Sequence, residues 1–454
     1  MHKSYLTKLM RVGIVVIMVS LLISIVSIIG STAGEEKVYE LKANIIGPGP
    51  VGVKKAENLE LAANKLNQML ESMGSPVRVK LSVAFSELKW GPFADKFYID
   101  FKAGNAPDVT NLRWDPKLAD GGFIIPVDKY INMWWDLNYY DFYSNLWEGV
   151  TWKDKIWGVP NDICPAGAWY RKDVLRKLGY TDDEILKMLP LDGRTTLDKL
   201  AELAKEAVDA GLVEYGILHR PSKGAGFYAT LLEFGVKCYN PDTGNLVLDE
   251  SALSKYYEWH ADMVKKGVIQ PEPPSWKTIH ATFAEGKTFC TLASHVGTPG
   301  EWKAKYGLTD EALDNDLGFL PFPPSVKDGK PISVHEFAPY MITSQCKYPD
   351  IAALLIMYAT SPDACAIHSA HTLRPPYRGS ALENPLIKDN EYIQRTATSA
   401  LTIQPVPVHP DFWDYISRAF EALKGVEAGI ITPTQAVDDL KAFTTTIQNV
   451  ELIK

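Results

Sequence analysis

Just beyond the N-terminal segment, the pattern of apolar and polar residues follows a strand, helix, strand order. Residues 41–46 are a short apolar run that ends at a Gly-Pro-Gly-Pro turn. Apolar residues then recur at helical spacing up to Gly74, a residue type that favours a helix end. Across residues 77–83 apolar and polar residues alternate, which is typical of a strand. This order predicts a right-handed βαβ unit and a mostly parallel sheet.

The same alternation returns in the middle of the chain. Thr195, with Asp198 three residues on, predicts a helix start with Thr195 as the N-cap. Gly211 predicts the end of that helix, before a short strand at 215–218.

The last third of the chain repeats the pattern. A strand at 340–343 precedes a helix at 350–360, and Pro433 directly after Thr432 predicts the start of a final helix. The Pro- and Gly-rich segment 321–332 predicts an exposed crossing or turn. Together these elements predict an α/β fold with two sheets, in which a ligand lies between lobes or beyond the strand ends.

Length and charge narrow the class of protein. A chain of 454 residues exceeds the usual size of one domain and predicts two. The net charge is −8 and the basic residues are dispersed, which argues against nucleic acid as a partner. The 12 Trp and 21 Tyr matter if some of them line a cleft.

The first 34 residues have the three sections of an export signal. Lys3, Lys8 and Arg11 precede an apolar run at 12–29, and small residues follow at 30–34. The run is long enough that an uncleaved membrane anchor is an alternative to a cleaved signal peptide. Either interpretation places the rest of the chain outside the cytoplasm, and the anchor would associate it with the membrane.

The cysteines do not form a metal or redox motif. No CxxC pair occurs, which disfavours a zinc ribbon or a thioredoxin-type site. One or two disulfides and buried free thiols are both compatible with this wide, odd-numbered spacing: Cys164, Cys238, Cys290, Cys346 and Cys365.

Two further motifs imitate known sites. Cys365, His368 and His371 are spaced by three and spread around a predicted helix, so packing explains them better than a metal. Residues 285–288 (EGKT) look like the end of a phosphate loop, but Ala281 stands where that loop needs glycine. We therefore expect neither a metal nor a cofactor.

Several blocks, in the same order, resemble a known family. Residues 96–132 contain Gly104, then Pro-Asp-Val, then a glycine-rich apolar block that ends in Asp128. KIWGVP at 155–160 with WYRKD at 169–173 is a second block, and FAEGK at 283–287 is a third. Further blocks follow at 348–358, 372–376 and 429–436. Their order resembles the extracellular solute-binding proteins of ABC sugar importers, in particular the maltodextrin-binding group, over about 41–440.

The resemblance implies a two-lobed periplasmic-binding-protein fold with crossing hinge strands and a ligand cleft between the lobes. After the signal or anchor at 1–34, it implies that the chain visits each lobe twice. The first lobe comprises 35–162 and 333–384, and the second comprises 163–332 and 385–454. A return to the first lobe near 283–320 stays open.

Sugar binding requires aromatic faces for C–H surfaces and polar groups for hydroxyl pairs. The loop after Val109 offers both kinds of group in Asn111, Trp114 and Asp115. Alternatively, Trp114 packs on the lobe surface and Asp115 caps the helix after Pro116. Asn161 and Asp162, at the first crossing that the resemblance implies, either bind hydroxyls or form an Asx turn that fixes the hinge.

Trp413 matches the Phe-Trp pair at which the family stacks a sugar, and a core position beside Ile416 and Phe420 is the alternative. His295 stands where the maltodextrin group has a stacking aromatic, a departure that suggests a different or shorter ligand. The remaining candidates lie near predicted strand ends or the second crossing, with surface ion pairing as the alternative: His219, Arg220, Glu336, Tyr377 and Arg378.

The resemblance implies a binding protein that captures a sugar or oligosaccharide and delivers it to the permease of an ABC transporter. A secreted carbohydrate-active enzyme, with carboxylates such as Asp115 and Asp162 across the cleft, is the alternative. A peptide or polyamine ligand for the same importer role also stays open.

Overall fold

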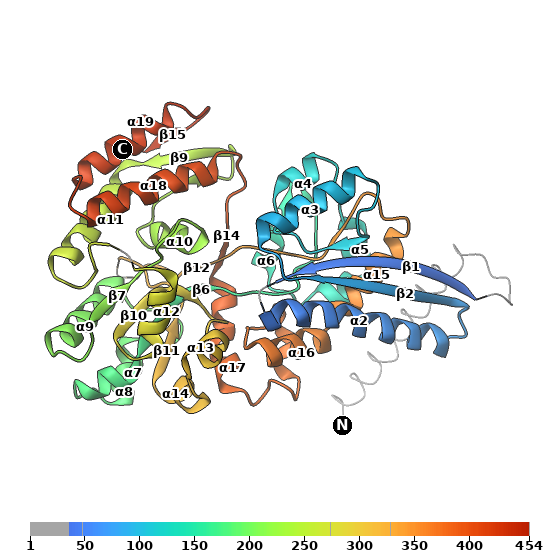
Figure 1. Cartoon of the computed structure of the whole chain (residues 1–454), viewed down its shortest axis with the longest axis horizontal. Helices are drawn as coiled ribbons and strands as arrows, with labels where there is room; N and C mark the ends of the chain where they lie inside the picture. The colour runs from blue at the N-terminus through green and yellow to red at the C-terminus, as the bar shows by residue number, and fades with distance from the viewer. Residues whose placement is uncertain (1–35, 48, 273, 327, 454) are drawn as a thin grey trace, which may run out of the picture.

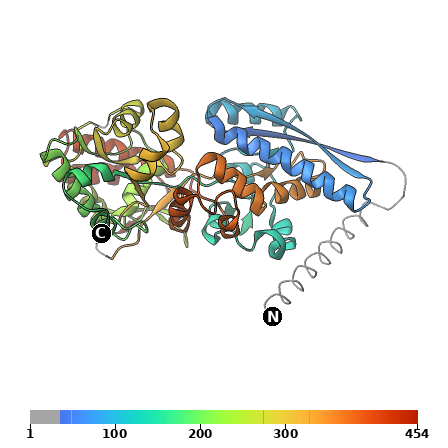
Figure 2. The ribbon, with the colours of Figure 1, turned by 90° about the horizontal axis from the view of Figure 1, so that it is seen from below.

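The chain folds into two lobes side by side, joined by crossing segments (Figures 1 and 2). The computed structural model describes residues 36–47, 49–272, 274–326 and 328–453. The predicted signal peptide or anchor at 1–34 lies outside the described residues.

The first lobe is built on a four-stranded sheet in the order β13-β3-β1-β2. β1 (Lys37–Ile46) and β2 (Val77–Ser86) are parallel along their whole length, which confirms the predicted strand, helix, strand unit. β3 (Val109–Thr110) is parallel to β1, whereas β13 (Met341–Ile342) is antiparallel to β3. The other elements of this lobe are α3 (Trp90–Lys102), α4 (Pro116–Asp120), α5 (Asp128–Met133), η1 (Trp135–Tyr139), α6 (Ser144–Glu148), β4 (Thr151–Trp152), β5 (Lys155–Ile156), α15 (Pro349–Ala359) and α16 (Pro362–Thr372).

Helix α2 (Gly49–Ser72) covers this sheet because its apolar residues form one stripe. Leu59 and Leu66 on that stripe are fully buried. Asn67 ties the helix to β2 by accepting from Val79 N and donating to Val79 O, both at 2.8 Å. Gly74 has a φ of +69°, a conformation that glycine adopts readily, and it follows the helix end as predicted.

The second lobe has a mixed sheet in the order β11-β6-β10-β7. β7 (Tyr215–Leu218), the predicted strand, is parallel to β10 (Thr288–His295). β6 (Ala166–Arg171) is antiparallel to both β10 and β11 (Leu317–Leu320), so the predicted mostly parallel arrangement is wrong for this sheet. Within 283–320, the strands β10 and β11 therefore belong to this sheet.

Helices and a small second sheet complete this lobe. A three-stranded sheet has the order β15-β9-β8 and lies under the C-terminal helices (Figure 1). These elements are α7 (Lys172–Lys177), α8 (Asp182–Met188), α9 (Leu197–Asp209), α10 (Ala225–Glu233), β8 (Tyr239–Asn240), β9 (Asn245–Asp249), α11 (Glu250–Lys265), α12 (Trp276–Ala284), α13 (Pro299–Tyr306), α14 (Asp310–Asn315), α18 (Phe412–Glu427), α19 (Pro433–Thr444) and β15 (Glu451–Ile453).

Two helix starts test the capping predictions. Thr432 caps α19 in a capping box with Gln435, as the Thr-Pro pair predicts. The N-cap of α9 is Thr196, whose side chain accepts from Lys199 N, and not the predicted Thr195. Adjacent threonines offer the same chemistry, so only the backbone geometry decides between them.

The crossing segments lie together between the lobes. Val159, on the first, bridges Tyr340 on the second, and β12 (Ser333–His335) pairs with β14 (Ile403–Pro405) in parallel. The segments η2 (Gly379–Glu383), α17 (Glu391–Ala397) and η3 (Thr398–Thr402) lead into β14. In 321–332, predicted to be exposed, Pro321 to Pro324 are buried and Phe322 bridges Ile332. The segment is therefore a turn with an exposed tip that precedes the crossing.

A buried charge cluster holds the first crossing to the first lobe. The Asp162 carboxylate lies 3.1 Å from Lys55 Nζ on α2 and 2.9 Å from His368 Nε2 on α16. Arg374, just after α16, also donates to it. Burial alone would raise the pKa of Asp162, but Arg374 and Lys55 hold it well below its usual range. The crossing is thus fixed to two helices of one lobe.

All five cysteines are free thiols, and Cys346 alone among them is not buried. This confirms the free-thiol interpretation over a disulfide.

In the described part of the chain, no single helix is long and apolar enough to cross a membrane. The bent pair α15–α16 meets the length and composition test only when its two helices are taken together.

We expect Asp162→Asn to lower the free energy of unfolding by about 3–5 kcal/mol, because it leaves Lys55 and Arg374 buried without their shared counterion. Urea unfolding followed by Trp fluorescence measures this change. Asp192→Asn is the matched control, since Asp192 pairs with Arg194 at the surface. A loss for Asp162→Asn no larger than for the control would contradict a stabilising role for the cluster.

Candidate functional site

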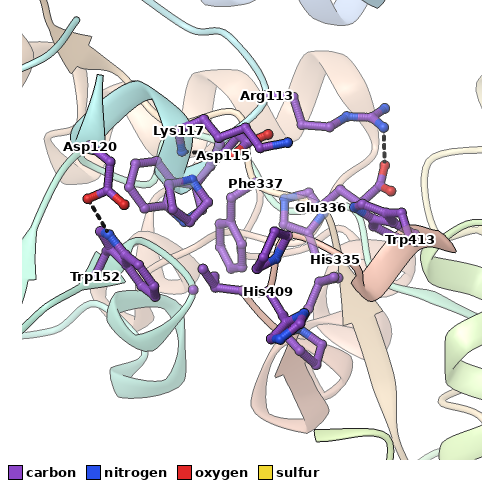
Figure 3. A pocket seen from close by; sticks show the side chains of 17 residues that line it. Arg113, Asp115, Lys117, Asp120, Trp152, His335, Glu336, Phe337, His409 and Trp413 are labelled. Atoms are coloured by element: carbon purple, nitrogen blue, oxygen red, sulfur yellow. Dashed lines mark hydrogen bonds and ion pairs between the residues drawn. The ribbon is translucent and has the colours of Figure 1, made fainter. Parts of the chain in front are cut away.

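A pocket of about 240 Å³ lies between the lobes (Figure 3). The first lobe contributes the loop and helix at 113–120, with Gly149 and Trp152. The crossing after β12 contributes 335–337, and the second lobe contributes 406–410 and Trp413. A ligand in this pocket would therefore touch both lobes and the crossing.

The first-lobe wall is held in place by Asn111. Its side chain accepts from Ile46 N at 2.8 Å and donates to Ile46 O at 3.1 Å, so the end of β3 is tied to the end of β1. Three residues on, Trp114 N donates to Phe337 O at 2.8 Å, which joins this loop to the crossing. Asn111 itself is buried and does not line the pocket.

Asp115 has the capping role that the sequence left open. Its carboxylate accepts from Lys117 N at 2.8 Å and caps α4, while the residue also lines the pocket. At the other end of α4, Asp120 accepts from Trp152 Nε1 at 3.0 Å and pairs with Lys153 at 2.7 Å.

Aromatic side chains from both lobes face the pocket. Trp114 and Trp152 belong to the first lobe, Phe337 to the crossing and Trp413 to the start of α18 (Figure 3). The indole nitrogen of Trp114 is buried and has no hydrogen-bond partner among the described residues. Trp413 combines the two interpretations weighed from the sequence, because it packs partly on the second-lobe core and also lines the pocket.

Glu336, on the crossing, forms an ion pair with Arg113 of the first-lobe loop, and both residues line the pocket. Its carboxylate lies 3.0 Å from Arg113 Nη1, and the Arg113 guanidinium lies 5.3 Å from the centre of the Trp90 ring. Both partners are partly exposed, so solvent screens the attraction. The pair connects the first-lobe loop to the crossing at the pocket.

The structure therefore brings Trp114, Asp115, Glu336 and Trp413 together. Asn161 and Asp162 lie at the crossing and are buried, with Asp162 held in its charge cluster. Both amide atoms of Asn161 are without a hydrogen-bond partner among the described residues. Neither residue lines the pocket.

Tyr377 and Arg378 are fully buried in the first lobe. Arg378 pairs with Asp141 and donates to Asn138 Oδ1 at 3.0 Å and to Thr360 O at 2.7 Å. These contacts give Arg378 a structural role, in place of the surface ion pair weighed from the sequence.

His295 lies at the end of β10 and does not line the pocket. Its Nδ1 lies 3.0 Å from Cys164 O, and burial lowers its pKa to about 3, helped by Arg220. A neutral imidazole whose Nδ1–H donates to that carbonyl fits both observations.

His219, directly after β7, is buried in the second lobe. Its Nε2 and Nδ1 of His260 lie 2.9 and 2.8 Å from the Glu427 carboxylate. Burial opposes the ionisation of Glu427. The two imidazoles, His219 more strongly than His260, nevertheless lower the pKa of Glu427 to about 2. The atoms of His219, His260 and Glu427 that could bind a metal lie within 4.8 Å of one another. Hydrogen bonds between these three residues already satisfy those atoms. Arg220 follows His219 and borders the ring of Trp276.

Other residues of the pocket were missed from the sequence. His335 and Phe337 come from the crossing, Trp152 from the β4–β5 hairpin, and His409 from the segment before α18. The Pro-rich sequence 405–410 (PVPVHP) directly before Phe412-Trp413 is the one local signal that could have indicated part of this wall.

The family model for bacterial extracellular solute-binding proteins matches residues 77–364. No curated protein matches the chain significantly. Among solved structures, the sugar-binding protein MalE of Xanthomonas citri has a TM-score of 0.74 at 16% identity, covering 90% of this chain and 97% of that one. The cyclic alpha-maltosyl-1,6-maltose binding protein of Arthrobacter globiformis has a TM-score of 0.69 at 16% identity, covering 90% and 99%. The GacH receptor of Streptomyces glaucescens has a TM-score of 0.67 at 17% identity, covering 90% and 100%.

At these identities the structural likeness establishes the two-lobed fold, and the family model establishes the relationship. The resemblance read from the ordered sequence blocks is thereby confirmed. The chain belongs to the bacterial extracellular solute-binding protein family.

Proposed function

We propose that this protein is the substrate-binding component of an ABC importer and that it captures a sugar or oligosaccharide outside the cell. The observation that carries the proposal is the aromatic pocket between the lobes. Trp114, Trp152 and Trp413 offer ring faces to a pyranose, and Arg113 and Glu336 offer hydrogen bonds to its hydroxyls.

Similar proteins support a saccharide ligand. The GacH structures include complexes with acarbose and an acarbose homologue. MalE3 of T. maritima is bound to maltose, and a cyclo/maltodextrin-binding protein is complexed with maltotetraose. The position of the aromatic pocket between two lobes, where a hinged receptor needs its ligand, also supports the proposal.

The mechanism that we propose follows from the pocket wall, to which the first lobe, the crossing and the second lobe each contribute residues. A ligand that contacts both lobes and the crossing binds the closed arrangement more tightly, so it shifts the hinge equilibrium toward closure. The closed form then docks on the membrane permease. The segment 1–34 exports the chain and, if it is retained, holds it at the membrane.

The geometry gives little support to hydrolysis by an Asp115–Asp162 pair. Asp162 is buried among Lys55, His368 and Arg374, and Asp115 caps α4. A general acid needs a raised pKa, whereas the pKa of Asp162 is held well below its usual range. A peptide or polyamine ligand is the other alternative, and the binding measurement below includes both.

We expect Trp413→Ala to weaken saccharide binding by about 2 kcal/mol, which is roughly 30-fold in Kd, because a ring face leaves the pocket. A thermal-shift screen of the full chain in detergent, against malto-oligosaccharides, peptides and polyamines, identifies the ligand, and calorimetry measures Kd. Saturating ligand at 100 times Kd stabilises the folded state by about 2.7 kcal/mol.

Trp135→Ala is the matched control, since Trp135 is 40% exposed on η1 and lies outside the pocket. Its Kd should equal that of the wild type. A thermal shift with a peptide or polyamine and none with any saccharide would keep the importer role and overturn the sugar assignment.

We also expect the purified protein to leave saccharides intact, because Asp162 is held in its buried charge cluster outside the pocket and Asp115 caps α4. Incubation with the bound saccharide, followed by chromatography of the products, tests this. Turnover that Asp115→Asn abolishes would favour the enzyme instead.

A further inference from the structure

Arg220 lies at the carboxyl end of β7, where ligands bind in α/β sheets. Its backbone is fixed because His219 Nδ1 donates to the Arg220 carbonyl at 2.9 Å, while His219 Nε2 faces Glu427. The position of this arginine is therefore set by the buried interior of the second lobe.

The Arg220 side chain is a cation without a carboxylate partner among the described residues. Its guanidinium lies 4.6 Å from the centre of the Trp276 ring, and its Nε is buried with no hydrogen-bond acceptor. Burial lowers the pKa of Arg220 to about 10. The negative charge of Glu336 raises this pKa, and the positive charge of Arg113 lowers it further. Glu336 already pairs with Arg113 at 3.0 Å.

The first turn of α10 lies against this guanidinium. A Cβ on Gly226 would lie 2.4 Å from Arg220 Cδ and 2.6 Å from Nη1, so only glycine lets the side chain lie there. The N-cap of α10 is Gly224, which has no side chain to accept from the first N–H groups. The uncapped N–H groups and the helix dipole favour an anion at this end, and Lys223 adds a nearby positive charge.

Ring contacts and charge connect this region to the pocket. Tyr228 on α10 packs edge to face on Phe412, with ring centres 5.1 Å apart, and Phe412 contacts its neighbour Trp413 at the same distance. The charges of Glu336 and Arg113, which both line the pocket, also reach Arg220. The charge of Arg220 therefore acts on the pocket lining, although Arg220 itself does not line the pocket.

The carboxylates of the pocket do not oppose an anion strongly. Asp120 accepts from Trp152 and pairs with Lys153, Glu336 pairs with Arg113, and Asp115 accepts from Lys117 N. Arg220 at the helix N-terminus has no ion pair among the described residues, and Lys117 adds a second cation at the pocket wall.

We propose that Arg220 and the uncapped N-terminus of α10 form an anion subsite, so that the saccharide taken by the proposed function carries a carboxylate or a phosphate group. Trp276 holds the guanidinium by stacking, and Gly226 lets it reach the first turn of the helix. The inference rests on the proposed function and specifies the chemical class of its ligand.

Titration of the full chain in detergent with matched ligands tests the subsite. The probes are a neutral malto-oligosaccharide, uronate oligosaccharides of the same length, and sugar phosphates. We expect the wild type to bind one anionic class at least about 10-fold more tightly than the neutral one, as charge-assisted hydrogen bonds allow. Which anionic probe binds best distinguishes a carboxylate from a phosphate ligand.

Two variants locate the effect. Arg220→Met should weaken anionic binding about 10- to 100-fold more than it weakens neutral binding. Gly226→Ala keeps the positive charge but displaces the guanidinium, so it should cause a similar selective loss. Arg194→Met, at an exposed position that pairs with Asp192, is the control and should change neither affinity.

Preferred binding of the neutral saccharide by the wild type, or an equal loss for both ligand classes in Arg220→Met, would overturn the anion subsite while leaving the sugar-receptor role intact. Failure of every saccharide to bind the wild type would instead overturn the proposed function. Thermal unfolding of each variant shows whether it is folded.

Discussion

The arrangement of this molecule depends on one buried carboxylate. Asp162 lies on the first crossing and draws Lys55 of α2, His368 of α16 and Arg374 toward a single point. These groups come from parts of the first lobe that are far apart in the sequence, and only their shared counterion makes their burial tolerable. The crossing is thus a rigid extension of the first lobe, so the bending that closes the cleft has to occur elsewhere along the connections.

Local patterns predicted the elements that depend on local chemistry. The stripe of apolar residues on α2, the glycine after it and the Thr-Pro start of α19 each carry their own signal. The mixed order of the second sheet has no such signal, because strand direction is decided by where a distant segment pairs. β6 pairs with β10 and β11, both more than a hundred positions later in the chain.

The candidate site residues also differ in how well the sequence predicted them. Trp114 and Asp115 were predicted from the loop that follows a strand, and Trp413 from its match to the family's Phe-Trp pair; all three line the pocket. His219 and Arg378 have equally polar side chains, but their partners Glu427 and Asp141 are distant in sequence, so the sequence could not distinguish burial from ligand contact. Arg220 differs from both. Its place just after a strand was predicted, but only the fold shows that no carboxylate among the described residues pairs with it.

The interleaved connectivity also constrains the order in which the molecule folds. The edge strand β13 completes the first sheet beside β3, and Thr343 next to it donates to the carbonyl of Pro107 across a separation of 236 residues. Until that late segment has been made, the strands of the first lobe have an unpaired edge and α2 lacks α15 and α16 beside it. Such distant pairings slow folding. The earliest part of the chain therefore stays incomplete until the part of the second lobe between the two crossings has been made. A chain that is still unfolded in this way can be threaded through a narrow channel.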